Sequence, residues 1–584
     1  MKYRWVIAHV DPETVTLLMG SDSNPGDYHS AILAQCLANR KVSTPEQAIA
    51  FLNPRLGILS DPFLLPDMEI AVDRVLKAIN KQEKVTIVGD YDVDGLVATA
   101  ILSETLGMFG LQAEQFIPRR IEEGYGLTIT TAQKCVSMFD PSLIITVDCG
   151  SSSAEALTWL RNRAIDVIVI DHHHVATLPT QALALINPHR NTASEDPLKV
   201  GQFTELCSGA LAFKFCHALI KRARQLNIPR AFEIDLKSFL DLVTLATIAD
   251  AVPLTGENRI FSKIGLMYLN QSKRPGILAL KQVAQTSNKL EAWDVAFLLA
   301  PRLNAAGRLN TARDALELLM TRDSHRAHVL AQQLDIQNRQ RQEIEKQVFE
   351  SALLRLKDNF DPQSHYAIVL GDEHWHIGVI GIVAAKILQQ FYRPTVIMGG
   401  AGSYWRGSAR SIPGFHLVKA LQKCSHLLVG FGGHSAAAGI SINPCNVNQF
   451  AQTFNSIATE ELSTNQLLPL LELDAEITLR DVTMELAESL IQLRPWGIGN
   501  PQPKFLIRRL THAHPPRRIG SEGRHTKLWV TDGHTCCPVI WWDSNGETLP
   551  TGAFDIACTI TLNEYEGRTY PQLELIDWRP AVDD

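Results

Sequence analysis

The chain has 584 residues, of which 45% are hydrophobic and 20% are charged. This length predicts several domains, and the composition is typical of a globular protein rather than of a disordered or fibrous chain. Because 62 Asp and Glu outnumber 55 Lys and Arg, the formal net charge is -7, which excludes a protein that coats nucleic acid by overall basicity. Any nucleic-acid site must therefore be a local basic patch.

The ten cysteines are scattered and include no CxxC pair, which predicts reduced thiols in a cytoplasmic protein. The first residues, MKYRWVIAHVDPETV, lack the apolar core of a signal peptide. The longest weakly polar stretch, 427–442, is rich in glycine and shorter than the roughly 20 apolar residues of a spanning helix. We therefore expect no role in a membrane.

Three short apolar runs alternate with amphipathic stretches in the first half of the chain. They are VTIVGD (85–90), LIITVD (143–148) and DVIVID (166–171), and each ends at an Asp. Runs that are apolar on both faces are typical of buried parallel strands, and the helical spacing between them predicts βαβ units. We expect the three acids at the carboxyl ends of parallel strands, where such sheets bind ligands.

Further along, a stretch without Gly or Pro from Arg308 to Asp361 carries an apolar stripe that predicts a long helix. A second α/β unit opens with YAIVLGD (366–372), and short alternating runs near the C-terminus predict a small β-barrel. The expected order is an N-terminal segment (1–70), an α/β domain (71–320), a connecting helix (321–361), a second α/β domain (362–456) and an OB-like barrel (466–584).

Asp90, Asp92 and Asp94 follow the first predicted strand at alternate positions. On an extended chain their side chains point the same way, and three close carboxylates take up protons unless cations neutralise them. A solvated acidic turn is the alternative. An EF-hand is excluded because the closing Glu of its loop is missing.

Other acids and imidazoles strengthen the metal hypothesis. Asp148, the run Asp171-His172-His173 and Asp250 close other apolar runs. Singly, they read equally well as a helix cap, surface histidines and a turn acid. Together they form the set of carboxylates and imidazoles that Mn²⁺ or Mg²⁺ accepts, and the lack of thiolates argues against structural zinc.

These motifs carry a family resemblance. GDYDVDG, TVDCG, DHH and TIAD resemble, in this order, the metal-binding motifs of the DHH phosphoesterase superfamily. Further motifs are similar to those of the RecJ family of bacterial exonucleases: PRLNAAGRL (301–309), WHIGVIGIVAAKI (375–387), RGSARS (406–411), GFGGHSAAAG (430–439) and RPWGIGNPQPKF (494–505). The N-terminal TPEQAIAFLNP also matches, so the resemblance covers nearly the whole chain.

The resemblance implies a DHH-type domain, a DHHA1-like second domain and an OB-like barrel. It implies an exonuclease that removes 5′-mononucleotides from single-stranded DNA in the 5′→3′ direction with two Mn²⁺ or Mg²⁺ ions, in DNA repair and recombination. Its partners would be single-stranded DNA with a 5′ end, a single-strand-binding protein and a helicase, and the enzyme would be a monomer. The alternatives are a DHH phosphodiesterase acting on short oligonucleotides or nucleotide second messengers, and an inactive DNA-binding scaffold.

The resemblance also suggests roles for single residues. The expected metal ligands are Asp92, Asp94, Asp148, His172 and Asp250, with Asp148 bridging the ions. His173 would contact the scissile phosphate as hydrogen-bond donor or general acid, or serve as a further ligand, and Asp171 would orient an imidazole. Pyrophosphate-hydrolysing relatives carry a histidine where this chain has Val88, whereas the exonuclease branch carries Asp90, as a ligand or as an orienting group.

Substrate contacts are expected in two places outside the metal cluster. Arg302, Asn304 and Arg308 are expected in a polar loop that clamps phosphate, with a structural salt bridge as the alternative for each arginine. Consecutive glycines predict an anion-binding nest, in which Gly432, Gly433 and His434 with Ser408 and Arg410 would hold the 5′ end of the strand. His376 would assist binding, or cap or pack the helix that follows it.

The barrel segment is locally basic. It carries Arg508, Arg509, Arg517, Arg518, Arg524 and Lys527, interleaved with Trp529, Trp541 and Trp542. A basic groove with aromatic platforms is how OB-folds hold single strands without sequence preference, and Arg517, Arg518 and Arg524 are the expected contacts. Because a tryptophan of a small barrel is more often in the core, the arginines are the stronger part of this signal.

Overall fold

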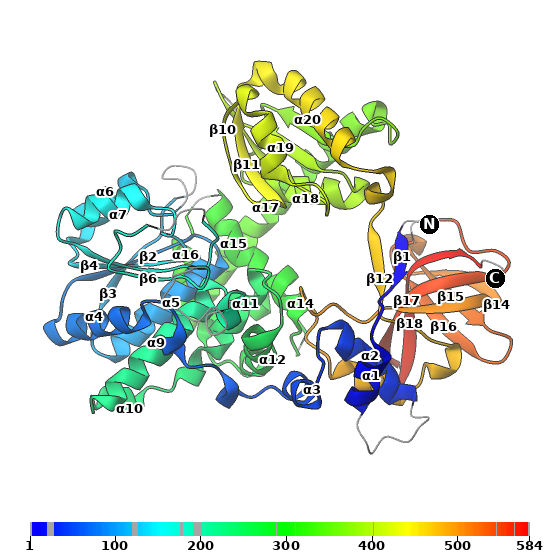
Figure 1. Cartoon of the computed structure of the whole chain (residues 1–584), viewed down its shortest axis with the longest axis horizontal. Coiled ribbons are helices and arrows are strands. Elements are labelled where there is room, and N and C mark those ends of the chain that lie inside the picture. Colours follow the sequence, from blue (N-terminus) through cyan, green and yellow to red (C-terminus); the bar gives the residue numbers. More distant parts are fainter. Residues whose placement is uncertain are drawn as a thin grey trace. The chain divides into compact units, whose positions relative to one another are not determined.

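A computed structural model describes residues 3–19, 28–119, 126–175, 179–190, 201–287, 289–309, 311–400, 402–544, 546–565 and 567–581. The chain divides into two compact units (Figure 1). We call His9–Asn338 with Thr483–Pro503 the parallel-sheet unit, and Met1–Ala8, Arg339–Val482 and Lys504–Asp584 the barrel unit. The chain therefore passes between the units several times.

The parallel-sheet unit is built on five strands in the order β3-β2-β4-β5-β6, all parallel. Their bounds are β2 (Val85–Gly89), β3 (Ala113–Phe116), β4 (Leu143–Val147), β5 (Asp166–Ile170) and β6 (Ala184–Ile186). Every residue of β2 and β4 is buried, which explains why both faces of these runs are apolar. The predicted parallel sheet is confirmed.

Helices cover both faces of this sheet. Ile87 and Ile145 pack into one core with α4 (Met68–Lys81), α5 (Val93–Met108) and α9 (Ser208–Gln225). Their neighbours Val88 and Ile144 point to the opposite face, against α6 (Ile129–Phe139) and α7 (Ala154–Arg161). The result is a three-layer α/β domain.

Short helices extend the first of these cores. They are α10 (Arg230–Glu233), α11 (Leu240–Ala249), α12 (Gly256–Asn270), α13 (Pro275–Val283), α14 (Ala292–Asp294), a π-helical turn (Val295–Leu299), α15 (Ala300–Leu309) and α16 (Arg313–Met320). The N-terminal α1 (Pro12–Met19), α2 (Tyr28–Asn39) and α3 (Pro45–Leu52) and the late α21 (Met484–Ile491) belong to the same unit.

The predicted long helix is α17 (Ser324–Asn359). It begins later than Arg308, where the stretch without Gly or Pro starts. Thr321 is extended after α16, and the side chain of Asp323 accepts hydrogen bonds from the amides of His325 and Arg326. This N-cap starts a new helix. Its first half packs in the parallel-sheet unit, whereas the stripe that includes Val348 and Leu356 packs in the barrel unit.

The barrel unit contains a mixed sheet in the order β10-β11-β9-β8-β7, in which only the pair β7–β8 is parallel. The strands are β7 (Ile368–Asp372), β8 (Thr395–Gly399), β9 (Trp405–Arg410), β10 (Leu428–Gly433) and β11 (Ala437–Ile442). The helices are α18 (Ile380–Phe391), α19 (Leu417–Lys423) and α20 (Val447–Glu461). This is the predicted second α/β domain.

The C-terminal strands close into a barrel because β14 pairs with both β15 and β17. The strands are β14 (Phe505–Ile519), β15 (His525–Thr531), β16 (Cys536–Trp541), β17 (Phe554–Tyr565) and β18 (Arg568–Pro580), with β13 (Ala475–Glu476) alongside β14. The N-terminal β1 (Arg4–Ile7) pairs with β12 (Leu470–Leu473), and both pack against the barrel. The predicted OB-like barrel is confirmed. Among the described residues, no helix combines the length and the apolarity needed to cross a bilayer.

Candidate functional site

The acids singled out in the sequence meet at one edge of the parallel sheet. Asp90, Asp148 and Asp171 directly follow β2, β4 and β5, so the parallel arrangement places them at neighbouring strand ends. Asp92 is the N-cap of α5, and Asp94 lies in its first turn. Asp250 comes from outside the sheet, as the C-cap of α11.

His172 lies among the carboxylates. Its Nε2 is 3.4 Å from Oδ1 of Asp148, 3.7 Å from Oδ2 of Asp250 and 3.8 Å from Oδ2 of Asp94. Among the residues that the structure describes, three groups of possible ligands have donor atoms within 4.8 Å of one another: Asp148, His172 and His173; Asp94, His172 and Asp250; Asp90, Asp92 and Asp148. Asp148 and His172 each belong to two of the groups, so the groups form one continuous cluster.

Backbone amides fix the orientation of these carboxylates. Both oxygens of Asp94 accept hydrogen bonds of 2.7 Å, one from the amide of Ser208 and one from that of Gly209, at the start of α9. The hydroxyl of Ser208 donates to Asp148 at 3.1 Å. The sequence did not indicate a role for Ser208 and Gly209, because a serine-glycine pair before an apolar helix is typical of an ordinary helix start.

A second set of hydrogen bonds orients His173. Nδ1 of His173 lies 2.7 Å from Oδ1 of Asp171, and Asp171 also accepts from the amides of Ser151 and His172. Although burial alone raises the pKa of Asp171, these hydrogen bonds, that of His173 foremost, lower it to about 2. Burial lowers the pKa of His173, but the Asp171 carboxylate outweighs it and raises that pKa above its usual value.

The central carboxylates are held at an electrostatic cost. Burial, followed by the charges of neighbouring acids, raises the pKa of Asp148 well above its usual range and also raises that of Asp92. The same causes raise the pKa of Asp250 to about 9. Divalent cations relieve such repulsion, and oxygen-rich sites with one or two imidazoles suit Mn²⁺ and Mg²⁺. The residues present therefore fit the predicted ions.

The metal-free protein should lose stability as the pH rises from about 5 to about 9. Folded Asp250 keeps its proton up to a pKa of about 9, whereas an unfolded Asp loses it near pH 4. The folded state therefore binds more protons in this window, and the free energy of unfolding falls with rising pH, by at most about 1.4 kcal/mol per pH unit for each such carboxyl.

Because cations replace these protons, the increase in melting temperature on adding Mn²⁺ should grow over the same window. Thermal melts at about pH 5.5, 7 and 8.5, with EDTA or with Mn²⁺, measure both effects. A Mn²⁺-induced shift of equal size at all three pH values would contradict this expectation.

Residues 301–309 do not form the predicted polar loop; they form α15, which continues the π-helical turn Val295–Leu299. Arg302 pairs with Asp335 at 2.9 Å, which is the salt-bridge alternative for this residue. Oδ1 of Asn304 accepts a hydrogen bond of 3.0 Å from the amide of Val93, next to Asp92. Arg308, in the last turn of α15, is partly buried. This segment thus packs against the loop that carries Asp90 and Asp92.

The predicted glycine nest is also wrong, since Gly430, Gly432 and Gly433 lie in the edge strand β10. Alternating pairing with β11 gives this segment extended geometry instead of the turns that build a nest. Gly432 and Gly439 are exposed neighbours in register with Ser408, and a Cβ on either glycine would meet no atom within 4 Å. The strands therefore offer a bare strip of backbone.

Ser408 and Arg410 border this strip. The Arg410 guanidinium donates to Oγ of Ser408 at 3.0 Å, and both side chains lie against Gly381 in the first turn of α18. His434 makes the turn into β11, its amide bonded to the carbonyl of Ala437. Nδ1 of His376 accepts a hydrogen bond from the amide of Gly378, in the turn before α18, so this histidine does not cap the helix itself.

On the barrel, the basic residues divide into two groups. Arg517 and Lys527 are paired across β14 and β15, and their charged groups lie 5.7 and 4.9 Å from the ring of Trp529. Arg518 instead donates to Ser544, and Arg524 pairs with Asp543 at 2.6 Å. Arg508 pairs with Glu476, and Arg509 has a left-handed backbone with its amide bonded to Asp555.

The tryptophans also differ. Trp541 is 4% exposed and belongs to the core, as expected for a small barrel, whereas Trp542 is 48% exposed. Trp529 alternates along β15 with the buried Leu528 and Val530, so its partly exposed ring faces outward. A cationic and aromatic patch of Arg517, Lys527 and Trp529 therefore lies on the outside of β14 and β15.

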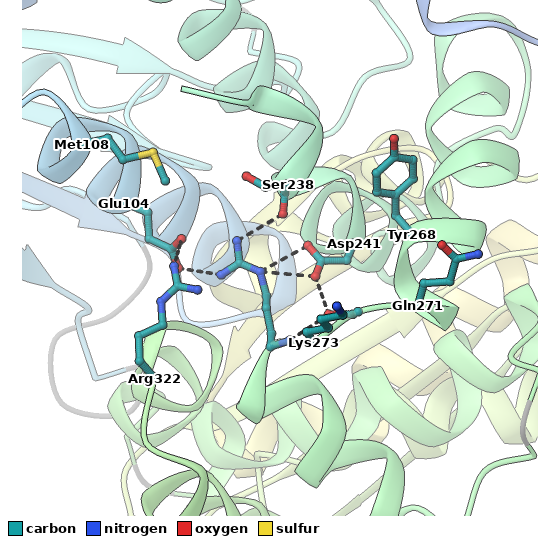
Figure 2. Close-up of a pocket in the computed structure, with 10 residues that line it drawn as sticks. Glu104, Met108, Ser238, Asp241, Tyr268, Gln271, Lys273 and Arg322 are labelled. Atoms are coloured by element: carbon teal, nitrogen blue, oxygen red, sulfur yellow. Dashed lines mark hydrogen bonds and ion pairs between the residues drawn. The ribbon is translucent and has the colours of Figure 1, made fainter. Parts of the chain in front are cut away.

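A pocket of about 440 Å³ lies at the other end of α5, about 15 Å along the helix from Asp94 (Figure 2). Four of its charged residues pair with one another: Glu104 binds Arg274 at 2.6 Å and Arg322 at 2.7 Å, and Asp241 binds Arg274. Asp241 also accepts a hydrogen bond from Ser272. These pairs serve the packing of the helices, and the pocket is separate from the carboxylate cluster.

The fold and the cluster of carboxylates and imidazoles define a DHH-type phosphoesterase. Family models match the chain in three places: the DHH family, N-terminal domain, at residues 84–247, the DHHA1 domain at 362–460 and the RecJ OB domain at 473–577. The chain belongs to the RecJ family.

Several relatives support this assignment. The single-stranded-DNA-specific exonuclease RecJ of Bacillus subtilis is 32% identical over 99% of this chain and 71% of its own length. The protein of the same description from Haemophilus influenzae is 32% identical over 91% of this chain and 94% of its own length. The crystal structure of RecJ in complex with Mn²⁺ from Thermus thermophilus superposes with a TM-score of 0.83 and 27% identity, over 100% of this chain and 80% of that one.

Proposed function

We propose that this protein is a metal-dependent exonuclease that removes mononucleotides from the 5′ end of single-stranded DNA, in DNA repair and recombination. The observation that carries the proposal is the cluster of Asp92, Asp94, Asp148, His172 and Asp250, whose donor atoms lie close together at the carboxyl edge of the parallel sheet. Relatives that match most of this chain are described as single-stranded-DNA-specific exonucleases, and the RecJ of Thermus thermophilus was solved with Mn²⁺.

These five residues would hold two Mn²⁺ or Mg²⁺ ions, with Asp148 shared between them. Bound there, the ions would supply a nucleophile at neutral pH and positive charge over the phosphodiester. The chain contributes the orientation of the ligands. Ser208 and Gly209 fix both oxygens of Asp94, so this carboxylate does not need to reorganise when an ion binds. Asp90 completes a group with Asp92 and Asp148, as a ligand or as an orienting acid.

His173 is the proposed proton donor to the substrate. Its Nδ1 is engaged by Asp171, so Nε2 is the atom that would donate to a phosphate oxygen or the leaving group. The carboxylate of Asp171 raises the pKa of His173, so a larger share of this imidazole carries a proton at neutral pH. Because His173 belongs to the group with Asp148 and His172, the alternative is that it serves as a metal ligand.

The strand would be bound at three further places. Arg302, Asn304 and Arg308 are proposed near the metal cluster, although Arg302 must share its charge with Asp335. The bare strip of β10 and β11, with Ser408, Arg410 and His434 and assisted by His376, lets a phosphate backbone approach closely and would hold the 5′ end. On the barrel, Arg517 with Lys527 and Trp529 offers cations and a stacking surface, with Arg518 and Arg524 beside them.

Digestion of single strands labelled at the 5′ or the 3′ end tests the proposal. With Mn²⁺ or Mg²⁺, a 5′ label should appear at once as mononucleotide, a 3′ label only at the end, and EDTA should stop both. A matched duplex should resist, as expected for an enzyme that acts on single strands. Early release of the 3′ label would overturn the direction, and preference for dinucleotides or cyclic dinucleotides would favour a small-molecule phosphodiesterase.

The protein is further proposed to be a monomer that works in the cytoplasm. Its proposed partners are a single-strand-binding protein and a helicase, and the helicase would expose single strands. Light scattering and pull-down with the purified proteins test these parts separately from the activity.

A further inference from the structure

The motif RPWGIGNPQPKF (494–505) is not part of the site described above, but the structure brings it close to Asp250. Although residues 483–503 lie in the sequence between barrel strands β13 and β14, they belong to the parallel-sheet unit. There, the loop 494–500 packs on the connection between α11 and α12, which begins at Asp250.

The contact between loop and connection is close and uses backbone. The carbonyl of Ile498 accepts a hydrogen bond of 2.7 Å from the amide of Leu254, four residues after Asp250. Gly499 has a φ of +72°, and a Cβ there would lie 2.9 Å from Cβ of Pro253. A Cβ on Gly497 would lie 2.6 Å from Cδ1 of Leu254. Gly499 therefore has to be a glycine, whereas a Cβ at position 497 would require the Leu254 side chain to shift.

The loop has its own rigid frame. The fully buried Asn500 donates at 2.8 Å to the carbonyls of Leu493 and Pro495, and its Oδ1 accepts from Nε of Arg40 at 2.6 Å. Gly497 and Asn500 are also joined by backbone hydrogen bonds in both directions. These hydrogen bonds stabilise the shape of the loop through its own residues and Arg40.

The connection is anchored at its far end as well. Arg259 in α12, 2% exposed, donates to the carbonyl of Leu493 at 3.1 Å and to that of Phe51 at 2.6 Å. Asn258 donates to the carbonyl of Pro253 at 3.1 Å. The start of α12 and the loop are therefore tied into one body.

Asp250 depends on this body for its position. It is the C-cap of α11, and Ala251 after it has a left-handed φ of +59°, so the chain turns sharply there. We propose that the loop 494–500 is a positioning element for the metal centre: it holds Pro253 and Leu254 in place and thereby keeps the Asp250 carboxylate 3.7 Å from His172. This inference rests on the proposed function, because it takes Asp250 as a metal ligand.

Gly497→Ala tests the inference. The added methyl pushes on the end of a flexible side chain, so the variant should fold and melt with EDTA as the wild type does. Displacing a residue that orients a ligand typically costs a factor of about 10–100 in metal affinity. Electron paramagnetic resonance titrations should show this weaker Mn²⁺ affinity. The Mn²⁺ concentration for half-maximal cleavage should rise by the same factor, while kcat at saturating Mn²⁺ should equal that of the wild type.

Two further variants and a control make the test specific. Leu254→Ala removes the contact without adding atoms and should also weaken Mn²⁺ binding. The double variant Gly497→Ala/Leu254→Ala should bind Mn²⁺ more tightly than either single variant, because the new methyl fills part of the vacated space. Gly57→Ala is the control, since Gly57, like Gly497, has no positive φ, but a Cβ there would meet no atom within 4 Å.

The outcomes separate the two proposals. If the wild type binds no Mn²⁺, the proposed metal centre is wrong. If the wild type binds Mn²⁺ and both Gly497→Ala and Leu254→Ala bind it equally well, the loop does not position Asp250. An equal loss of stability with and without Mn²⁺, at unchanged affinity, would likewise overturn the inference in favour of a purely structural loop.

Discussion

Asp148→Asn should lower kcat/KM on single-stranded DNA by at least about a thousandfold, which corresponds to about 4 kcal/mol of transition-state free energy. Asp148 belongs to two of the three ligand groups, so its neutralisation weakens both proposed ions. Asn is the suitable replacement because the backbone at this position is left-handed, with a φ of +61°, which Asn tolerates. It also keeps an oxygen for the hydroxyl of Ser208.

The same variant should be at least as stable as the wild type without metal. Since burial and neighbouring acids raise the pKa of Asp148, a neutral amide removes repulsion rather than a favourable charge. The melting temperature measured with EDTA should be unchanged or higher than that of the wild type. Its increase on adding Mn²⁺ should be much smaller. The exposed Asp358 in α17 provides the control Asp358→Asn, with the same change of charge. Cleavage by folded Asp148→Asn within tenfold of wild type at saturating Mn²⁺ would contradict the assignment.

Replacing Trp529 by Ala should weaken single-strand binding about 5- to 150-fold, because stacking on an aromatic side chain is worth about 1–3 kcal/mol per base. Arg517→Ala/Lys527→Ala should act differently. Each lost phosphate contact on a single strand reduces the slope of log affinity against log salt by about 0.7, so the double variant should flatten it by about 1.4. Fluorescence anisotropy with a labelled oligonucleotide, measured with EDTA over a range of salt, gives both quantities.

The matched control is Lys77→Ala/Lys81→Ala, which removes two exposed cations from α4 in the other unit. It should leave the slope unchanged. Cleavage of very short oligonucleotides should survive the barrel substitutions, since the metal cluster is untouched. If the barrel double variant and this control give the same slope, the patch of Arg517, Lys527 and Trp529 does not bind the strand.

The position of the metal cluster could be predicted because it follows from local patterns. Apolar runs on both faces indicated parallel strands, and an acid at the end of each run then had to lie at one edge of the sheet. The contributions of Ser208 and Gly209 could not be predicted, because they depend on α9 packing against Asp94 from more than 100 residues away. Spacing along the chain carries no signal for such a contact.

Outside the cluster, tertiary contacts overrode local composition. The glycines at 430–433 read as a nest, yet pairing with β11 draws them into a strand. The sequence could not show that Arg524 would pair with Asp543 while Arg517 stays beside Trp529, because both arginines lie in one basic run. Which of the tryptophans faces outward followed only from the register of β15 and β16.

The central claim is that the carboxylates and His172 form a two-metal centre. The most direct measurement is anomalous diffraction at the manganese edge from crystals grown with Mn²⁺. Two peaks at this edge of the sheet, both in contact with Asp148 and with His172, Asp94 or Asp92 around them, are the predicted result. A single peak without Asp148 among its ligands, or manganese bound only elsewhere on the chain, would contradict the account.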